Sequence, residues 1–581
     1  MRFLKPFLTL LLTASTLSAT VYNVRDHGAK GDGVALDSPA INAAIEAAAR
    51  AGGGTVVLPA GTYLSFSIRL RSNITLHLEA GAVLFAATPA EGFGAYDPPE
   101  PNDWGDKLQY QDFGHSHWQN SLIWGDGLQN IAITGPGLID GTKGLVRNAG
   151  YGGGRRGATG PDGTLPPGSA PAPVSVTPPG PPPPGAPAAG GPGQGPRSPV
   201  GQGNKAIGLR NCRNVTLRDF SVLNGGHFAL LATGVDHLTI DNLKVDTNRD
   251  GFDIDACRNV RVSNCSVNAP NDDAIVLKSS YGLGELRVTE NVTIANCLVS
   301  GFDVGSLLDA TFKRTQERAP DRDGPTGRIK FGTESNGGFK NITITNCAFD
   351  RSRGLALETV DGGIIEDVVI SNITMRDVSN SPIFIRLGNR ARGPQGTPVG
   401  AVRRVRLSGI TVNGADGRFP ILLAGLPGHP IEDVTIEGIH VLSRGGITLE
   451  QVAAQPAGLV NNFFLRGNEP GVTGPRDPFA VPAREPSYPE PSMFGLLPAS
   501  AIYARHVAGL VVRDVTYAYE QPDTRPRVVL DNVTGARFDE LDVAHPGKDQ
   551  AFVLRAVQDF AISRSPGVPD GRHDSADNLT F

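Results

Sequence analysis

Four aspartates lie close together near the middle of the chain, and their spacing suits acid and base chemistry. They are Asp250, Asp253, Asp272 and Asp273. Carboxylates that crowd one another raise the pKa of at least one member, so that a protonated acid persists near neutral pH beside an ionised base. The hydrolysis of a glycosidic bond requires that pair of groups. The alternative is that the four residues only form turns, because turns favour Asp, Asn and Gly.

Short segments rich in Val, Ile and Thr recur on both sides of these aspartates. Successive copies begin at Asn214, Asp236 and Asn259, at steps of 22 and 23 residues. A period of this length indicates a stack of repeats in which each unit buries its apolar face against its neighbours. With one strand and turn per repeat and no helical period between repeats, we predict an all-β fold, a parallel β-helix. A leucine-rich horseshoe is the competing solenoid, but its Leu-x-x-Leu-x-Leu pattern is missing.

The repeat predicts where the aspartates lie relative to one another. Asp250 and Asp272 are 22 residues apart, so they should have the same phase on adjacent coils, about 4.8 Å apart along the axis. Side chains that diverge from there can reach separations of roughly 6.5 to 9.5 Å. Such separations leave room for a water molecule in a glycosidase that inverts the anomeric centre.

The first residues have the three regions of a secretory signal peptide. A basic start, an apolar run and a set of small residues occupy residues 1–19, with cleavage expected near Ala19. The apolar run is too short to span a membrane, and no other segment reaches about 20 apolar residues. We therefore expect a secreted or periplasmic protein that makes no membrane contact.

The remaining residues, 20–581, are expected to form one catalytic β-helix domain. Near its start, residues 37–50 have the pattern of a short amphipathic helix with Asp37 or Ser38 as N-cap, placed to cover the open end of the first coil. Two segments interrupt the repeat. Residues 144–203 are rich in Gly and Pro and are expected to be a disordered insertion, while the aromatic residues of 453–500 indicate a loop that packs over the solenoid.

Composition excludes several other classes of function. Charged residues make up 19% of the chain and the net charge is -5, which gives no basic surface for nucleic acid. The five cysteines have no Cys-x-x-Cys spacing and no paired histidines beside them, so we expect no metal site and no cofactor. Three of them, Cys265, Cys297 and Cys347, end the same Asn-Cys unit and are predicted to stack inward as small apolar side chains.

Three segments carry a specific combination of motifs. They read Asn248-Arg-Asp-Gly-Phe-Asp253, Asn271-Asp-Asp-Ala-Ile275 and Asn23-Val-Arg-Asp-His-Gly-Ala-Lys-Gly-Asp-Gly33. Together they resemble glycoside hydrolase family 28, which contains the polygalacturonases and rhamnogalacturonan hydrolases. The resemblance implies a single-stranded right-handed parallel β-helix that cleaves a pectic polysaccharide with inversion. We expect such a protein to act as a monomer.

The resemblance also implies roles for individual residues. Asp272 would be the general acid that protonates the leaving oxygen, while Asp250 and Asp273 would share the general-base role. The residues expected to bind substrate are Asn248, Asp253, His227, Lys278, Arg328, Lys330, Glu334 and Glu358.

The chain departs from the family pattern on the coils after Asp272. No His occurs where the family carries Gly-His-Gly, and the Arg-Ile-Lys that grips a galacturonate carboxylate occurs one coil early, at Arg328 to Lys330. These cations are interpreted either as contacts for a substrate carboxylate or as a solvated strand face. Glu334 and Glu358 are added acids, better suited to neutral sugar hydroxyls than to a uronate. A substrate with a neutral sugar such as rhamnose at the cleaved position is therefore favoured.

Two other classes of protein remain open. A β-helix polysaccharide lyase would need a cation to neutralise a uronate and a Lys, Arg or Tyr base, which clustered carboxylates do not suggest. A non-catalytic glycan-binding solenoid is consistent with the missing His and the displaced Arg-Ile-Lys.

Overall fold

The structure is a computed structural model that describes residues 20–89, 94–106, 108, 110–111, 113–146, 201–319, 323–455, 474–543 and 551–581. The predicted signal peptide, residues 147–200 of the first interruption and residues 456–473 of the second lie outside the described residues. Within the described ranges, none of the helices is long and apolar enough to cross a membrane.

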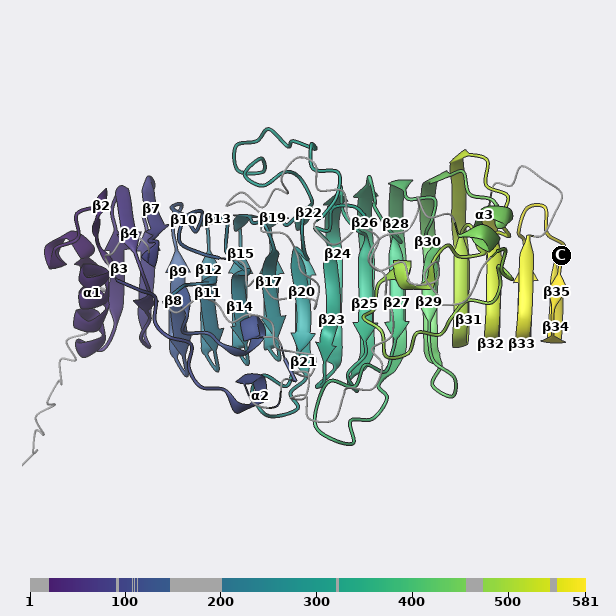
Figure 1. Cartoon of the computed structure of the whole chain (residues 1–581), viewed down its shortest axis with the longest axis horizontal. Helices are drawn as coiled ribbons and strands as arrows, with labels where there is room; N and C mark the ends of the chain where they lie inside the picture. Colours follow the sequence, from purple (N-terminus) through teal and green to yellow (C-terminus); the bar gives the residue numbers. More distant parts are fainter. Residues whose placement is uncertain are drawn as a thin grey trace, which may run out of the picture.

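The chain winds into stacked coils whose strands run parallel, as the repeat predicted (Figure 1). The first coils comprise β1 (Val21–Asn23), β2 (Asp32–Leu36), β3 (Gly54–Leu58), β4 (Gly61–Ser65), β5 (Ile68–Arg69), β6 (Ile74–Leu78) and β7 (Ala82–Ala86). The middle coils comprise β8 (Ser121–Asp126), β9 (Gln129–Thr134), β10 (Leu138–Asp140), β11 (Lys205–Arg210), β12 (Arg213–Arg218), β13 (Ser221–Leu223), β14 (Phe228–Thr233), β15 (Asp236–Asp241), β16 (Lys244–Asp246), β17 (Asp250–Asp255), β18 (Arg258–Ser263), β19 (Ser266–Asn268), β20 (Ile275–Ser279), β21 (Thr289–Ala295) and β22 (Leu298–Ser300). Each middle coil therefore has three strands, and the expectation of one strand per repeat is wrong.

The later coils have fewer strands, first two and then one per coil, because a long strand pairs with two strands of the coil before it. This change begins where β24 pairs with both β21 and β22. The later strands are β23 (Ile329–Ser335), β24 (Phe339–Asp350), β25 (Leu355–Thr359), β26 (Ile364–Arg376), β27 (Ile383–Leu387), β28 (Ala401–Ala415), β29 (Ile421–Ala424), β30 (Ile431–Gly445), β31 (Ile502–Gln521), β32 (Val528–Val543), β33 (Phe552–Ser563), β34 (Gly571–Ala576) and β35 (Leu579–Thr580).

Asparagine ladders explain why the repeat is visible in the sequence. Asn73, Asn130 and Asn214 all have φ near +60°, a left-handed conformation that Asn adopts more readily than most residues. Each side-chain amide donates to the Asn one coil earlier, at 2.9 Å in both steps. The alternating apolar residues of the strands point inward and form one continuous core. Cys265, Cys297 and Cys347 are buried and free, as predicted.

Both ends of the stack are covered. Helix α1 (Ser38–Arg50) lies at the N-terminal end, as predicted (Figure 1), with Asp37 as its N-cap. The Asp37 carboxylate accepts hydrogen bonds from the N–H groups of Lys30 and Gly31, so it orders the Gly-rich turn before the helix instead of capping it by its side chain. At the other end, β34 pairs antiparallel with β33, which ends the parallel stack.

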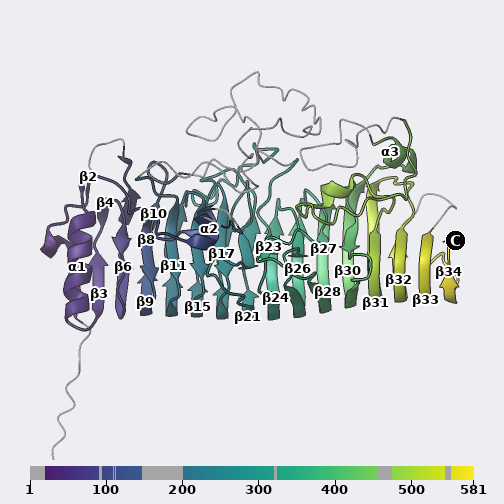
Figure 2. The same cartoon turned by 60° about the horizontal axis from the view of Figure 1, so that its bottom comes forward.

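The remaining helices lie in the connections between strands. They are η1 (Val24–His27), α2 (Asp103–Asp106), η3 (Phe113–Ser116), α3 (Leu449–Ala454) and η6 (Pro491–Phe494). In Figure 2, α3 and its neighbouring connections lie along the upper side of the stack, beside the strand row that contains β27. This row, which we call the first row, consists of β5, β8, β11, β14, β17, β20, β23, β25, β27, β29 and the starts of β31, β32 and β33.

Candidate active site

Asp250, Asp272 and Asp273 meet at one edge of the first row, and we call them the acid trio. Asp250 is the first residue of β17, and the other two lie in the turn before β20. All three are buried, and each has a carboxylate oxygen within 4.8 Å of an oxygen of the other two. The backbone N–H of Asp273 also donates to the Asp250 carboxylate, at 3.1 Å.

The register of these strands differs from the spacing expected for Asp250 and Asp272. Phe228 pairs with Asp250, a step of 22 residues, but Phe252 pairs with Ile275, a step of 23. One additional residue in the turn before β20 therefore places Asp273, not Asp272, level with Asp250. Asp272 is displaced outward, and its side chain is the more exposed of the two, at 11% against 5%.

The separation within the trio is also shorter than expected. The nearest oxygens lie within 4.8 Å of one another, whereas an acid-to-base separation of roughly 6.5 to 9.5 Å was predicted. The interval still suits a bridging water, because two hydrogen bonds of about 2.8 Å to one water span oxygens up to about 5.5 Å apart. Divalent cations use oxygen ligands at similar spacing, so the trio also has the donor set of a candidate cation site.

The three carboxylates differ in how their charge is compensated. The Arg249 guanidinium donates to Asp272, and Asp273 accepts from Arg328 at 2.8 Å and lies 3.3 Å from the Lys330 ammonium. Asp250 has no ion pair among the described residues. Burial, reinforced by the charges of Asp272 and Asp253, raises the pKa of Asp250 well above its ordinary value, although Lys278 and Arg249 oppose the shift. Burial without an ion pair therefore favours the protonated form of Asp250.

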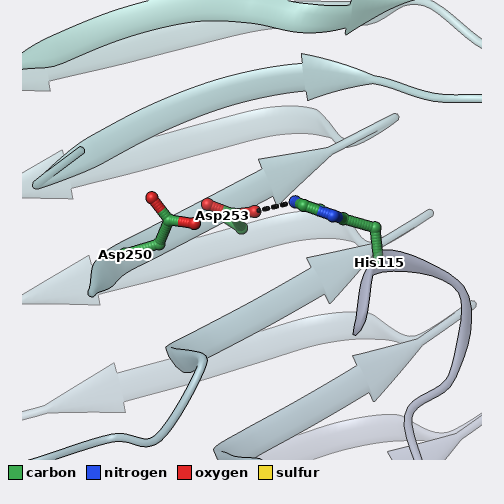
Figure 3. A group of neighbouring side chains, drawn as sticks. All are labelled: His115, Asp250 and Asp253. Atoms are coloured by element: carbon green, nitrogen blue, oxygen red, sulfur yellow. Dashed lines mark ion pairs between the residues drawn. The ribbon is translucent and has the colours of Figure 1, made fainter. Parts of the chain in front are cut away.

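A second group of charges adjoins Asp250 along the first row (Figure 3). The Asp253 carboxylate lies 3.1 Å from the imidazole Nε2 of His115 and 3.2 Å from the Lys278 ammonium. Lys278 also lies 3.1 Å from Glu334. Burial by itself would lower the pKa of Lys278, but Asp253, Glu334 and Asp250 raise it well above its ordinary value. Lys278 is therefore a permanent cation beside the trio.

Glu334 is surrounded by cations from two directions. Besides Lys278, the guanidinium groups of Arg390 and Arg392 each lie 3.7 Å from its carboxylate. Burial would raise the pKa of Glu334, but Lys278, His115 and the two arginines lower it well below its ordinary value. Glu334 is thus an ionised carboxylate that lies among three basic side chains. Its contact with sugar hydroxyls stays a prediction.

A third group lies on the other side of the trio. Arg328 and Lys330 are both about 1% exposed, so the interpretation of a solvated strand face is wrong. Lys330 lies 3.4 Å from the carboxylate of Glu358, and its ammonium donates to the Tyr488 hydroxyl at 3.2 Å. Arg328 donates to Glu490 at 3.1 Å. These two cations are already paired with protein carboxylates.

Glu358 is fully buried at the boundary of this third group. Burial, with further contributions from the Glu490 and Asp273 carboxylates, raises the pKa of Glu358 to about 7, although Lys330 and Arg328 oppose the shift. Its predicted role in binding sugar hydroxyls stays a prediction, because no part of the side chain is exposed.

Asn248 and His227 also lie beside the trio. The Asn248 side-chain oxygen accepts from the Asn271 amide at 2.6 Å, which ties together the segments that hold Asp250 and Asp272. His227 is buried, and its ring centre lies 6.1 Å from that of His115. The predicted site residues thus lie in the trio or in the charged and polar groups that adjoin it, while their individual roles stay predictions.

Several charged residues of the site were not predicted. They are His115, Arg249, Arg353, Arg390, Arg392 and Glu490. Arg249 stands inside the Asn248 to Asp253 motif, so its position in the sequence could have indicated it. The others lie in connections or coils far from the motifs, and no repeat marks them.

Two family models match separate parts of the chain. Residues 21–138 match a family described as rhamnogalacturonase A/epimerase, pectate lyase-like, and residues 199–314 match the right handed beta helix region. The second match covers the strands from β11 to β22 and the turns between them, and it includes Asp250, Asp272 and Asp273.

Individual proteins match to different extents. Alginate lyase 7 of Azotobacter vinelandii is 67% identical over 42 residues, which cover 7% of this chain and 5% of that protein. A probable polygalacturonase of Vitis vinifera is 22% identical over 363 residues, 60% of each protein. The solved structure of the family 28 exopolygalacturonase of Yersinia enterocolitica is 19% identical, with a TM-score of 0.57, and the match covers 91% of this chain and 79% of that one. The chain therefore spans only a small part of the first relative and about three fifths of the second.

The matches agree with the motifs and with the strand topology. The expected parallel β-helix is confirmed, and the family model matched by residues 199–314 describes it as right-handed. The chain is a parallel β-helix protein that resembles, in sequence and in fold, the polygalacturonases of glycoside hydrolase family 28.

Proposed function

We propose that this protein hydrolyses a glycosidic bond in a pectic polysaccharide of the polygalacturonan or rhamnogalacturonan type. The observation that supports this proposal most directly is the acid trio, in which three buried carboxylates converge and one of them has no ion pair in the described part of the chain. The polygalacturonase relative supports the substrate class.

The trio has the parts that acid and base hydrolysis needs. Asp272 is the more exposed member of the turn pair, so it is placed to present a proton to the leaving oxygen. Asp250 and Asp273 are level on adjacent coils and hold the attacking water between them. Asp272 gives its proton to the leaving oxygen as the bond from the anomeric carbon to that oxygen breaks, while the water bonds to the anomeric carbon from the opposite face and loses a proton to Asp250 or Asp273. That proton then returns to Asp272 within the trio, which restores the starting state.

The proposal is tested by measuring the release of reducing ends from polygalacturonan and from rhamnogalacturonan I oligosaccharides. We expect release from at least one of them, and a loss of about a hundredfold or more in Asp272→Asn, because a positioned general acid contributes about 10²- to 10⁴-fold. Asp219→Asn is the matched control, since Asp219 is an exposed turn residue of the same solenoid with φ +71°. It should retain full activity.

The products separate the competing mechanisms. Proton NMR of the first product should show an inverted anomer, whereas a retained anomer would assign one trio member as a nucleophile, as the short separation also allows. Unsaturated products that absorb in the ultraviolet would identify a lyase. Binding without turnover on either polysaccharide, by a folded protein, would identify a glycan-binding solenoid and contradict the proposal.

We also propose that the protein is exported, because residues 1–19 have the regions of a signal peptide. Expression of the full chain, followed by mass spectrometry of the protein outside the cytoplasm, should find a new N-terminus near Thr20.

A further inference from the structure

The described residues 474–500, which we call the strap, lie against the outer surface of the first row. Met493, Phe494 and Leu497 pack in one cluster with Phe384 of β27 and Leu422 of β29. The strap is also held by its backbone. Arg386 of β27 donates to the carbonyl oxygens of Ala483, at 2.9 Å, and Arg484, at 3.2 Å.

The strap inserts one carboxylate beside the acid trio. Glu490 is fully buried, and its two oxygens contact guanidinium groups from two consecutive coils. Oε1 lies 3.1 Å from Arg328 and Oε2 lies 3.3 Å from Arg353. Arg328 in turn donates to Asp273. One guanidinium therefore connects a trio member to the strap.

Glu490 compensates part of the positive charge of the arginines and lysine beside Asp273. The cations Arg328, Lys330 and Arg353 are ion-paired with protein carboxylates, and Glu490 is shared by the two arginines. Without Glu490, the ion pair that Arg353 would keep among the described residues is with Asp323, at 3.5 Å. A ligand carboxylate entering here would have to displace Glu490 or lie beside it, and two carboxylates at one site repel each other. Discrimination by such a repulsive element is a common source of specificity.

We propose that Glu490 takes the place of a substrate carboxylate on Arg328 and Arg353, so that the sugar subsite beside Asp273 accepts an uncharged sugar and rejects a uronate. This inference rests on the proposed function, because it requires a saccharide to lie over the trio. Glu490 is then a residue that determines specificity. It belongs to the strap and lies outside the motifs that the sequence repeats carry.

The test measures binding, so that it does not depend on turnover. In an Asp272→Asn background, isothermal titration calorimetry compares galacturonate trisaccharide with rhamnogalacturonan I oligosaccharides. We expect Glu490→Gln to bind the galacturonate probe about tenfold more tightly, because a freed guanidinium gains a charge-assisted hydrogen bond. Binding of the rhamnogalacturonan probe should change by less than about threefold. Glu490→Asp keeps the charge and should behave as the parent protein does.

A second variant separates charge from a merely structural effect. Phe494→Leu loosens the packing of the strap but leaves Glu490 in place. If it raises galacturonate binding as much as Glu490→Gln does, the strap acts by shape and the inference is wrong. Rhamnogalacturonan binding with no galacturonate gain in a folded Glu490→Gln protein overturns this inference alone. Absence of binding of either probe to any variant overturns the proposed function as well.

Discussion

Two stretches of the first row have equivalent positions in the fold and different surroundings. One unbroken line of register runs through Asp253, Val276, Lys330, Ala356, Phe384 and Leu422. In the N-terminal stretch this line includes the charges of Asp253 and Lys330, which are buried with partners of opposite charge. In the C-terminal stretch it bears apolar side chains, which the strap covers. The outer side of one strand row thus supports either chemistry or packing, according to the residues that face outward.

The difference has an energetic reason. A buried charge costs several kcal/mol unless a partner compensates it, whereas buried apolar area is favourable without a specific partner. The polar stretch therefore needs groups from distant segments, such as His115 on Asp253 and Glu490 on Arg328. Asp250 differs from the other carboxylates of that stretch, because it has no ion pair among the described residues and burial raises its pKa, which favours its protonated form.

The largest effect is expected from Asp250→Asn, which separates function from stability in the polar stretch. Loss of the carboxylate should lower kcat by about 10²- to 10⁴-fold. The same change should stabilise the fold at neutral pH, because the folded-state pKa of Asp250 is raised. A carboxyl whose pKa is raised by folding makes the folded state less stable as the pH rises from its ordinary pKa through its folded-state pKa. An Asn side chain does not ionise, so the variant avoids this loss of stability. Activity assays and urea titration at neutral pH measure the two effects.

Asp253→Asn is the contrasting control for that prediction. Asp253 pairs with His115 and Lys278, so its removal takes one of the two nearby carboxylates from Lys278 and leaves it with Glu334. Breaking a buried pair in this way costs about 3 to 5 kcal/mol. If Asp250→Asn and Asp253→Asn both destabilised the protein, the distinction between a compensated and an uncompensated carboxylate would be wrong.

The next effect is expected from Phe494→Ala, which tests the apolar stretch. Phe494 is buried against Phe384 and lies under the Arg386 guanidinium, 5.4 Å from its ring centre. Truncation of a buried Phe costs about 3 to 5 kcal/mol, and the loss should appear as faster amide hydrogen exchange in the strap. Phe479→Ala is the matched control, because Phe479 is only partly buried in the same cluster. Equal exchange in the two variants would show that the strap does not depend on this packing.

The fold could be predicted from the sequence because its determinants are local and repeated. Turn residues such as Asn214 and Asn259 adopt a left-handed conformation on successive coils, and the apolar residues after them face the core. The trio could be located for the same reason, since Asp250 and Asp272 each belong to a short motif. The step of 23 residues, which places Asp273 opposite Asp250, could not be predicted, because it depends on one residue in a turn.

The surroundings of the trio could not be predicted, because they depend on long connections. Glu490 is 162 residues from Arg328 in sequence, and Lys278 is 163 from His115. No repeat or motif relates such pairs. The burial of Arg328 and Lys330 follows from the position of the strap, so the sequence left open whether they were solvated.

The smallest effect is expected from Glu358→Gln, at the boundary between the two stretches. Burial raises the pKa of Glu358 from 4.5 to about 7. Its contribution to stability is therefore complete below about pH 4.5 and is lost as pH rises to about 7. The free energy of unfolding of the wild-type protein, relative to Glu358→Gln, should fall by about 2 to 3 kcal/mol over this range. Urea titrations of both proteins at several pH values measure this difference, since groups distant from Glu358 titrate equally in each.

Glu366→Gln should give the opposite sign, which makes it the sharpest control for that result. Glu366 lies on β26, and although burial would raise its pKa, Arg403, Arg404 and Lys340 lower it. Its contribution to stability is present above the ordinary pKa and is lost as pH falls. Its magnitude should be smaller, because exposed ion pairs contribute only about 0 to 1 kcal/mol. If the two variants changed stability in the same direction with pH, burial would not be the cause of the raised pKa of Glu358.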